Sequence, residues 1–144
     1  MLSVLAVSVT LAVADIARAA PVTAGRSTVP SFLGCNGTRR EVRPVYILVS
    51  CGDANFYVNK LKWSRWISTA AVGTGTAHQN DCRPFCAAGH FHAYPVMIRL
   101  SRPETCGSRE RLFTRFTYVF SRSTPDGISR RHTISAPFYG RSCP

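Results

Sequence analysis

The sequence has few acidic side chains and almost no lysine. Seven of its 144 residues are Asp or Glu, whereas 18 are Lys or Arg, which gives a net charge of +11. Lys60 and Lys62 are the only lysines, so arginine carries the charge. The shortage of carboxylates weighs against glycosidase chemistry, which needs two of them facing one cleft. The Gly-x-Ser-x-Gly and His-Glu-x-x-His motifs of common hydrolases are also missing.

The sequence also has no apolar run of the ~20 residues that a membrane-spanning helix needs. Its apolar opening segment, residues 2–13, is shorter and leads into Ala17-Arg18-Ala19, whose small residues are typical of a signal-peptidase site. We therefore expect a secretory signal peptide over residues 1–19. The product would be secreted and extracellular, without a transmembrane segment.

Helical periodicity is missing from the rest of the chain, and no internal repeat occurs. Apolar and polar residues alternate over 56–63, 94–100 and 112–120, which predicts strands, and 66–76 and 128–134 suggest two more. The apolar run over 43–51 predicts a strand buried on both faces. We expect an all-β fold, a small disulfide-stapled antiparallel β-sandwich or barrel. A flexible leader over residues 20–40 would precede a single domain over 41–144.

Six cysteines follow the expected signal peptide, an even number that suggests three disulfides in an oxidising compartment. The spacing does not fix the pairing. We expect Cys35 to pair with Cys51, and the segment of Cys82 and Cys86 to be linked to Cys106 or Cys143.

A zinc site is the alternative for Cys82, Cys86, His90 and His92. The four residues from Cys86 to His90 are far fewer than the ~12 of a zinc finger, and an oxidising compartment disfavours free thiolates. We therefore expect neither a metal nor a cofactor.

The candidate ligand-binding residues lie beside the cysteines or among basic residues. Short polar side chains flank Cys51 and Cys82, and two histidines that are two apart would share one face of a strand. Trp63 and Trp66 are three apart, so we expect them on opposite faces of a strand, with one exposed for stacking on a sugar ring. The candidates are Asp53, Asn55, Trp66, Asn80, Asp81, His90 and His92. Catalytic residues stay unknown.

Several short motifs occur in an order that resembles a group of small exported proteins of high-GC Gram-positive bacteria. The resemblance covers residues 42–120 and implies a secreted β-rich domain, with no activity and no catalytic residues attached. The motifs are Val-Ser-Cys-Gly-Asp-Ala-Asn at 49–55, Trp63 with Trp66, Gly73-Thr74-Gly75, Gln79-Asn80-Asp81-Cys82, Cys86-Ala87-Ala88-Gly89 and Tyr94-Pro95-Val96.

These features favour a secreted, basic, monomeric binding domain without enzymatic activity. Its arginines would hold an anionic cell-envelope polymer, or its Cys82–Cys86 loop would contact a partner protein. We expect no specific nucleic-acid binding, because the arginines are scattered rather than gathered in one tract. One alternative is a small secreted hydrolase that uses Asp53, Asp81 or His90. Another is a cationic toxin or inhibitor.

Overall fold

The computed structural model describes residues 29–35, 39–106 and 110–135. The described residues contain strands and one short 3-10 helix but no α-helix, which confirms the predicted all-β antiparallel fold. None of them forms a helix with the length and apolarity that crossing a bilayer requires. The elements are β1 (Phe32–Leu33), β2 (Arg40–Glu41), β3 (Ile47–Leu48), β4 (Phe56–Trp66), β5 (Ala71–Asn80), η1 (Cys86–Ala88), β6 (Phe91–Cys106), β7 (Glu110–Phe120) and β8 (Arg131–Ser135).

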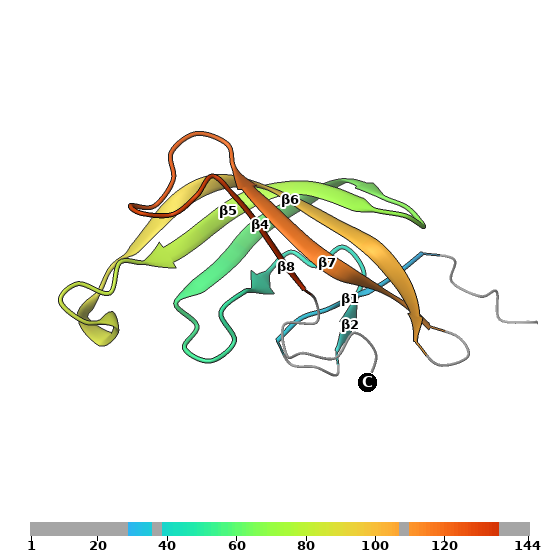
Figure 1. Ribbon diagram of the computed structural model, residues 1–144, viewed down its shortest axis with the longest axis horizontal. Coiled ribbons are helices and arrows are strands. Elements are labelled where there is room, and N and C mark those ends of the chain that lie inside the picture. Colours follow the sequence, from blue (N-terminus) through green and yellow to red (C-terminus); the bar gives the residue numbers. More distant parts are fainter. Residues whose placement is uncertain (1–28, 36–38, 107–109, 136–144) are drawn as a thin grey trace, which may run out of the picture.

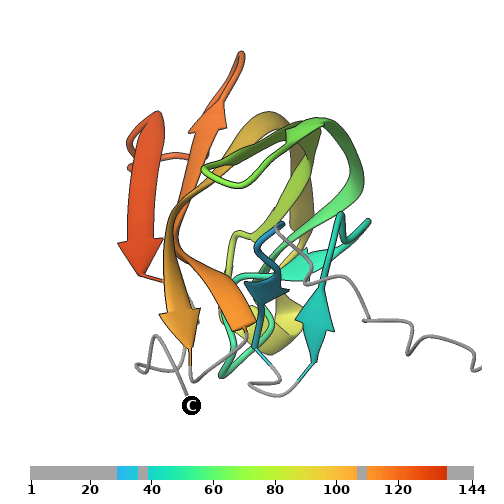
Figure 2. The same cartoon turned by 90° about the vertical axis from the view of Figure 1, so that its right-hand side faces the viewer.

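Strands β3 to β8 form one six-stranded antiparallel sheet in which the order in space repeats the order in sequence. The sheet curls into an open half-barrel, and the small β1–β2 sheet lies on its concave side (Figure 1). The view in Figure 2 shows the same curl from its side. A parallel bridge between Ser31 and Leu112 joins the segment before β1 to β7.

The hydrophobic core fills the concave side of the sheet. Successive side chains of a strand point to opposite faces, so alternate residues of β6 over 96–100 and of β7 over 116–120 enter the core. Ile98, Leu100 and Phe116 are fully buried. Regular alternation in these two strands explains why their sequence predicted them well.

The segment before β2 belongs to this core. Phe32 and Leu33 are each 1% exposed, and Phe32 packs against Phe116 with ring centroids 6.0 Å apart. The flexible leader that we predicted over residues 20–40 is therefore wrong for residues 29–35. The expected signal peptide over residues 1–19 lies outside the described residues.

The apolar run over 43–51 forms a much shorter strand than predicted. Only Ile47 and Leu48 belong to β3, and Ile47 enters the core. Val45 is 71% exposed, and Arg43 has a left-handed backbone with φ 54°. Pro44 cannot donate a backbone hydrogen bond, so the chain joins the sheet only after it.

Strand β4 contains two irregularities that reset which side chains face the core. Between Asn59 and Lys62, and again between Trp63 and Arg65, β4 advances one residue more than β5. Lys60, at the first of them, has a left-handed φ of 52°. Each extra residue is a β-bulge, and a bulge shifts the alternation of faces by one.

Two disulfides lie within the described residues. Cys35 pairs with Cys51 as predicted, and this bond ties the segment after β1 to the turn after β3. Cys82 pairs with Cys86, so the prediction that their segment is linked to Cys106 or Cys143 is wrong for these two residues. The β5–β6 loop turns back on itself and brings its own cysteines together. Cys143 lies outside the described residues.

Candidate functional site

The carboxylate of Asp53 holds the turn between β3 and β4. The Ser50 hydroxyl donates to Asp53 at 2.7 Å, and the backbone and side-chain N–H groups of Asn55 donate to it at 3.1 and 2.8 Å. These donors favour the ionised form and lower the pKa of Asp53, the Ser50 hydroxyl most of all. Asp53 is therefore the acceptor of an Asx turn.

Asn80, the last residue of β5, joins this turn to the β5–β6 loop. Its Nδ2 donates to Oδ1 of Asn55 and to the carbonyl oxygen of Cys86, each at 2.8 Å. Its Oδ1 accepts the backbone N–H of Cys82 at 3.0 Å. Asn80 is 6% exposed, so this is a buried amide whose donors and acceptor are satisfied.

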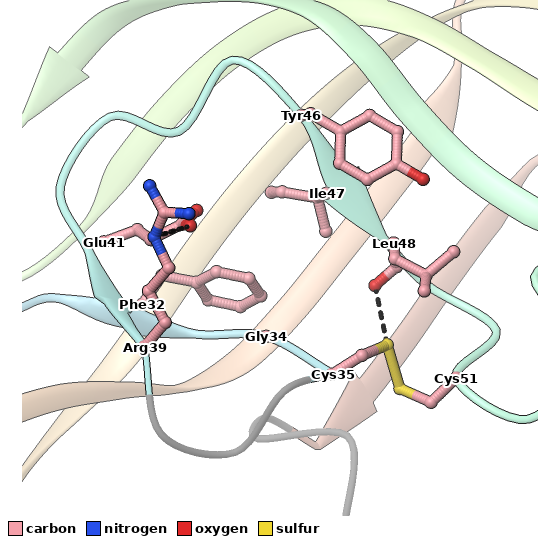
Figure 3. Close-up of a pocket in the computed structure, with 9 residues that line it drawn as sticks. All are labelled: Phe32, Gly34, Cys35, Arg39, Glu41, Tyr46, Ile47, Leu48 and Cys51. Atoms are coloured by element: carbon pink, nitrogen blue, oxygen red, sulfur yellow. Dashed lines mark hydrogen bonds and ion pairs between the residues drawn. A yellow bond between two sulfur atoms is a disulfide. The ribbon is translucent and has the colours of Figure 1, made fainter.

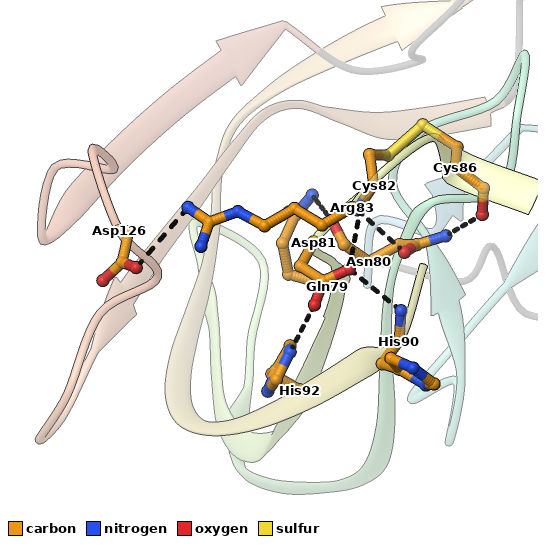
Figure 4. A network of polar contacts seen from close by, with 9 residues as sticks. All are labelled: Gln79, Asn80, Asp81, Cys82, Arg83, Cys86, His90, His92 and Asp126. Atoms are coloured by element: carbon orange, nitrogen blue, oxygen red, sulfur yellow. Dashed lines mark hydrogen bonds and ion pairs between the residues drawn. A yellow bond between two sulfur atoms is a disulfide. The ribbon is translucent and has the colours of Figure 1, made fainter. Parts of the chain in front are cut away.

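Asp81 orients a histidine ring. Its Oδ1 accepts the backbone N–H groups of Arg83 and His90 at 3.1 and 2.9 Å, and its Oδ2 lies 2.9 Å from Nε2 of His92. The bond from His92, followed by the backbone donors, holds the pKa of Asp81 well below its usual range. Because Asp81 is ionised, Nε2 of His92 is the donor, and the second ring nitrogen points away from Asp81 (Figure 4).

The structure brings six of the seven candidate residues together around two adjoining loops, five of them through their side chains. Each carboxylate accepts hydrogen bonds from its own loop, so the two do not form the free acid–base pair that a glycosidase would need. His90 takes part through its backbone N–H, and its side chain is exposed. The five residues are Asp53, Asn55, Asn80, Asp81 and His92.

These loops do not form a metal centre. In residues 29–35, 39–106 and 110–135, no group of three or more His, Cys, Asp or Glu side chains is placed to hold a metal ion. The two cysteines considered for a zinc site, Cys82 and Cys86, are bonded to each other. Their sulfur atoms are therefore not available as thiolate ligands.

Trp66 lies in the core instead of at an exposed binding surface. It is 6% exposed, and its Nε1–H donates to the carbonyl oxygen of Pro30 at 2.9 Å. The expectation that Trp63 and Trp66 face opposite sides is wrong, because Ser64 is the extra residue of a bulge. Both indoles therefore point to the concave side.

A cavity of about 360 Å³ opens beside Asp81 and His92. Gln79 and His92 are a cross-strand pair of β5 and β6, so they share a face, and Tyr94 follows on the same face of β6. The β7–β8 connection adds Asp126 to the lining. The cavity therefore combines polar side chains from three separate parts of the chain.

A second cavity, of about 350 Å³, lies between β1, β2 and β3 (Figure 3). Nε of Arg39 lies 3.1 Å from the carboxylate of Glu41, and Sγ of Cys35 lies 3.1 Å from the carbonyl oxygen of Leu48. The seven candidate binding residues do not line this cavity. Its two charged lining residues, Arg39 and Glu41, are therefore already paired with each other.

The convex side of the sheet carries basic side chains on β4, β6, β7 and β8. Ile98 and Leu100 are buried on the concave side, so Arg99 between them points to the convex side. The strand register places four further basic residues on the same side as Arg99. We call this set the cationic face, and its members are Lys62, Arg65, Arg99, Arg115 and Arg131.

The cationic face extends across the sheet in rows set by the register. Lys62 and Arg131 end one row that crosses β5, β6 and β7 through Thr74, Met97 and Val119. Adjacent strands are about 4.8 Å apart, so this row spans roughly 19 Å.

The neighbouring rows hold the other three arginines. Arg65 and Arg99 lie in one row on either side of Val72, roughly 10 Å apart by the same spacing. Arg115 lies in the row beyond, opposite Ser101. Four of the five members are exposed, and Arg115 is half-buried.

No carboxylate lies in these rows, and within the described chain none of the five basic side chains forms an ion pair. Two further carboxylates, Asp53 and Glu104, accept hydrogen bonds from the hydroxyl groups of Ser50 and Thr114. The positive charge of the cationic face is therefore uncompensated. The ion pairs of the described residues use Glu41, Asp81, Glu110 and Asp126.

The sequence analysis assigned binding to arginines in general and did not group these five residues into one face. Alternation within 94–100 and 112–120 would have identified Arg99 and Arg115 as outward-facing. The same argument fails for Lys62 and Arg65, because the bulges of β4 shift the alternation of faces.

The chain matches no family model, and its comparison with curated proteins and with solved structures gives no match. The resemblance to small exported proteins of high-GC Gram-positive bacteria therefore stays a prediction.

Proposed function

We propose that the protein works outside the cell, where its cationic face binds an anionic cell-envelope polymer without catalysing a reaction. The observation that carries this proposal is the set of five basic side chains on adjacent rows of the convex side, with no carboxylate among them. The two disulfides are compatible with an oxidising compartment.

The chemistry of the cationic face suits phosphate, sulfate or carboxylate groups repeated along a chain. Four of its members are arginines, and a guanidinium group can grip such an anion with two parallel hydrogen bonds. Because no neighbouring carboxylate competes, the face attracts anions from solution. A polymer can contact several members at once, so weak single contacts add up.

The hydrolase alternative has no such support. Asp53 and Asp81 are occupied by their own loops, and the side chain of His90 has no contact that orients it in the described structure. No specific feature of the described residues favours a toxin or inhibitor.

Retention on immobilised heparin, a sulfated polysaccharide, tests the proposal. We expect wild-type protein to elute at a higher salt concentration than the double variant R99Q/R115Q. Each lost anion contact reduces the dependence of log affinity on log salt by about 1. Polyphosphate beads in a parallel arm show whether sulfate and phosphate polymers are both bound.

The matched control is R43Q/R122Q, which removes the same charge from two residues outside the cationic face. It should elute at nearly the same salt concentration as wild type, although its net charge equals that of R99Q/R115Q. Equal losses in the two double variants would show that total charge, and not the face, governs retention. Retention that salt does not change would also contradict the proposal.

A further inference from the structure

The cavity beside Asp81 has features of a ligand site that the cationic face does not explain. Gln79, His92 and Tyr94 line the cavity from β5 and β6, and Asp126 lines it from the β7–β8 connection. The three residues of β5 and β6 lie on the concave side of the sheet, whereas the cationic face is convex. Its volume of about 360 Å³ is within the ~300–1,000 Å³ of small-molecule sites.

Both carboxylates beside this cavity already have partners. Asp81 faces His92 at 2.9 Å, and Arg83 lies 3.9 Å from Asp126 (Figure 4). The oxygens of Asp81 accept hydrogen bonds from Arg83, His90 and His92. A cationic ligand would have to displace these donors or Arg83, and an anionic ligand would be repelled by both carboxylates.

The cavity nevertheless offers hydrogen bonds. The second ring nitrogen of His92 points away from Asp81, and the hydroxyl of Tyr94 has no partner among the described residues. Gln79 uses its Nε2 on the carbonyl oxygen of Asn80, which leaves the amide oxygen as an acceptor. These groups both donate and accept, as hydroxyl groups do.

An apolar surface lies next to these polar groups. The ring of Tyr94 packs against Phe120 with centroids 5.8 Å apart, which fixes its orientation. Pro125 and Ile128 add apolar atoms to the lining. A ring with C–H groups on one side and hydroxyls at its edge suits this cavity. Its C–H side would pack on the apolar surface, and its hydroxyls would bond to the polar groups.

From the occupied carboxylates, the unused hydrogen-bonding groups and the apolar surface, we infer that this cavity binds a neutral, hydroxyl-rich ring of the size of one sugar residue. The site is separate from the cationic face, and neither requires the other. The cavity would recognise the end or a branch of a glycan, whereas the cationic face would recognise repeated negative charge.

Saturation-transfer NMR with the full-length protein tests this inference. The probes are glucose, galactose, mannose and N-acetylglucosamine, with glycine and inorganic phosphate as charged probes. We expect transfer to at least one of the sugars. The variants Q79A and Y94F, which remove single polar groups, should each weaken that binding about tenfold.

The cationic-face variant R99Q is the matched control and should bind the sugar like wild type. Transfer to none of the sugars would overturn the inference, as would sugar binding that is unchanged in both cavity variants. Binding of glycine or phosphate in preference to every sugar would also overturn it. Loss of sugar binding in the cavity variants with unchanged heparin retention would separate this site from the proposed polymer binding.

Discussion

The indole rings of Trp63 and Trp66 pack edge to face on the concave side of the sheet, with centroids 4.7 Å apart and planes 83° from parallel. The ring of Trp66 also packs against the ring of Phe113, with centroids 5.7 Å apart. Ser64 makes this arrangement possible, because it is the extra residue that brings both indoles to one face. The size of the core at this end of the sheet therefore depends on a residue that is itself exposed.

Deletion of Ser64 should expose an indole ring or unfold the sheet. Without the extra residue, the alternation of β4 would send Trp63 and Trp66 to opposite faces. We expect red-shifted tryptophan emission together with a lower melting temperature. Deletion of Ser123, in the β7–β8 connection, is the control and should leave the emission maximum unchanged. Wild-type emission in the Ser64 deletion would show that the bulge does not set the faces.

Substitution of Gly73 by alanine should destabilise the β4–β5 pair. A Cβ atom there would lie 2.8 Å from the carbonyl oxygen of Lys62 and 2.9 Å from the ring of Trp63. Overpacking of this kind costs about 1–3 kcal/mol, which urea unfolding would measure. Gly52→Ala is the matched control, because nothing lies within 4 Å of its Cβ position. Equal stability of the two variants would contradict the prediction.

Asn80→Ala should loosen the β5–β6 loop. The substitution removes three hydrogen bonds and leaves the backbone groups of Cys82 and Cys86 without their buried partner. We expect a loss of about 1–3 kcal/mol in unfolding free energy and faster amide exchange in the loop. Thr74→Ala, at an exposed position of the same strand, should change neither. Unchanged exchange in Asn80→Ala would show that the disulfide alone holds the loop.

The Asp81 carboxylate should make stability depend on pH in acid. Its pKa is lowered from 3.8 in the folded state, so the unfolded chain takes up the proton first as the pH falls. The stabilisation is present above about pH 4 and is lost below it, toward the lowered pKa. Melting temperatures of wild type and Asp81→Asn should differ at pH 7, and the difference should shrink steadily as the pH falls below 4. Asp126→Asn serves as control, and a constant difference at all pH values would contradict the prediction.

Regular alternation made β6 and β7 predictable, because a period of two with buried partners leaves little freedom of register. Leu112, Phe116, Tyr118 and Phe120 lie at even positions of the strand predicted over 112–120, and all four are buried. Pro125-Asp126-Gly127 is a typical turn sequence, and Gly127 has a φ of 70°. Turn chemistry is local, so the sequence contains it.

Bulges and long-range burial could not be predicted in this way. The local sequence does not mark the extra residues of β4, because serine and lysine, the residue types of Ser64 and Lys60, also occur in regular strands. The burial of Phe32 and Leu33 depends on their distant partner strand β7, with which the segment before β1 forms its bridge. For the candidate site, proximity to cysteine identified the loop residues but not their roles in holding the loops.

The meander has a consequence for how the protein is made. From β4 onward, every strand of the large sheet pairs with the strand that precedes it in the chain, and no connection crosses another. A chain that emerges N-terminus first can therefore close the β4–β5 hairpin before β6 has emerged. Each later strand then adds to an edge that already exists, so no step has to wait for a partner strand that comes later in the chain.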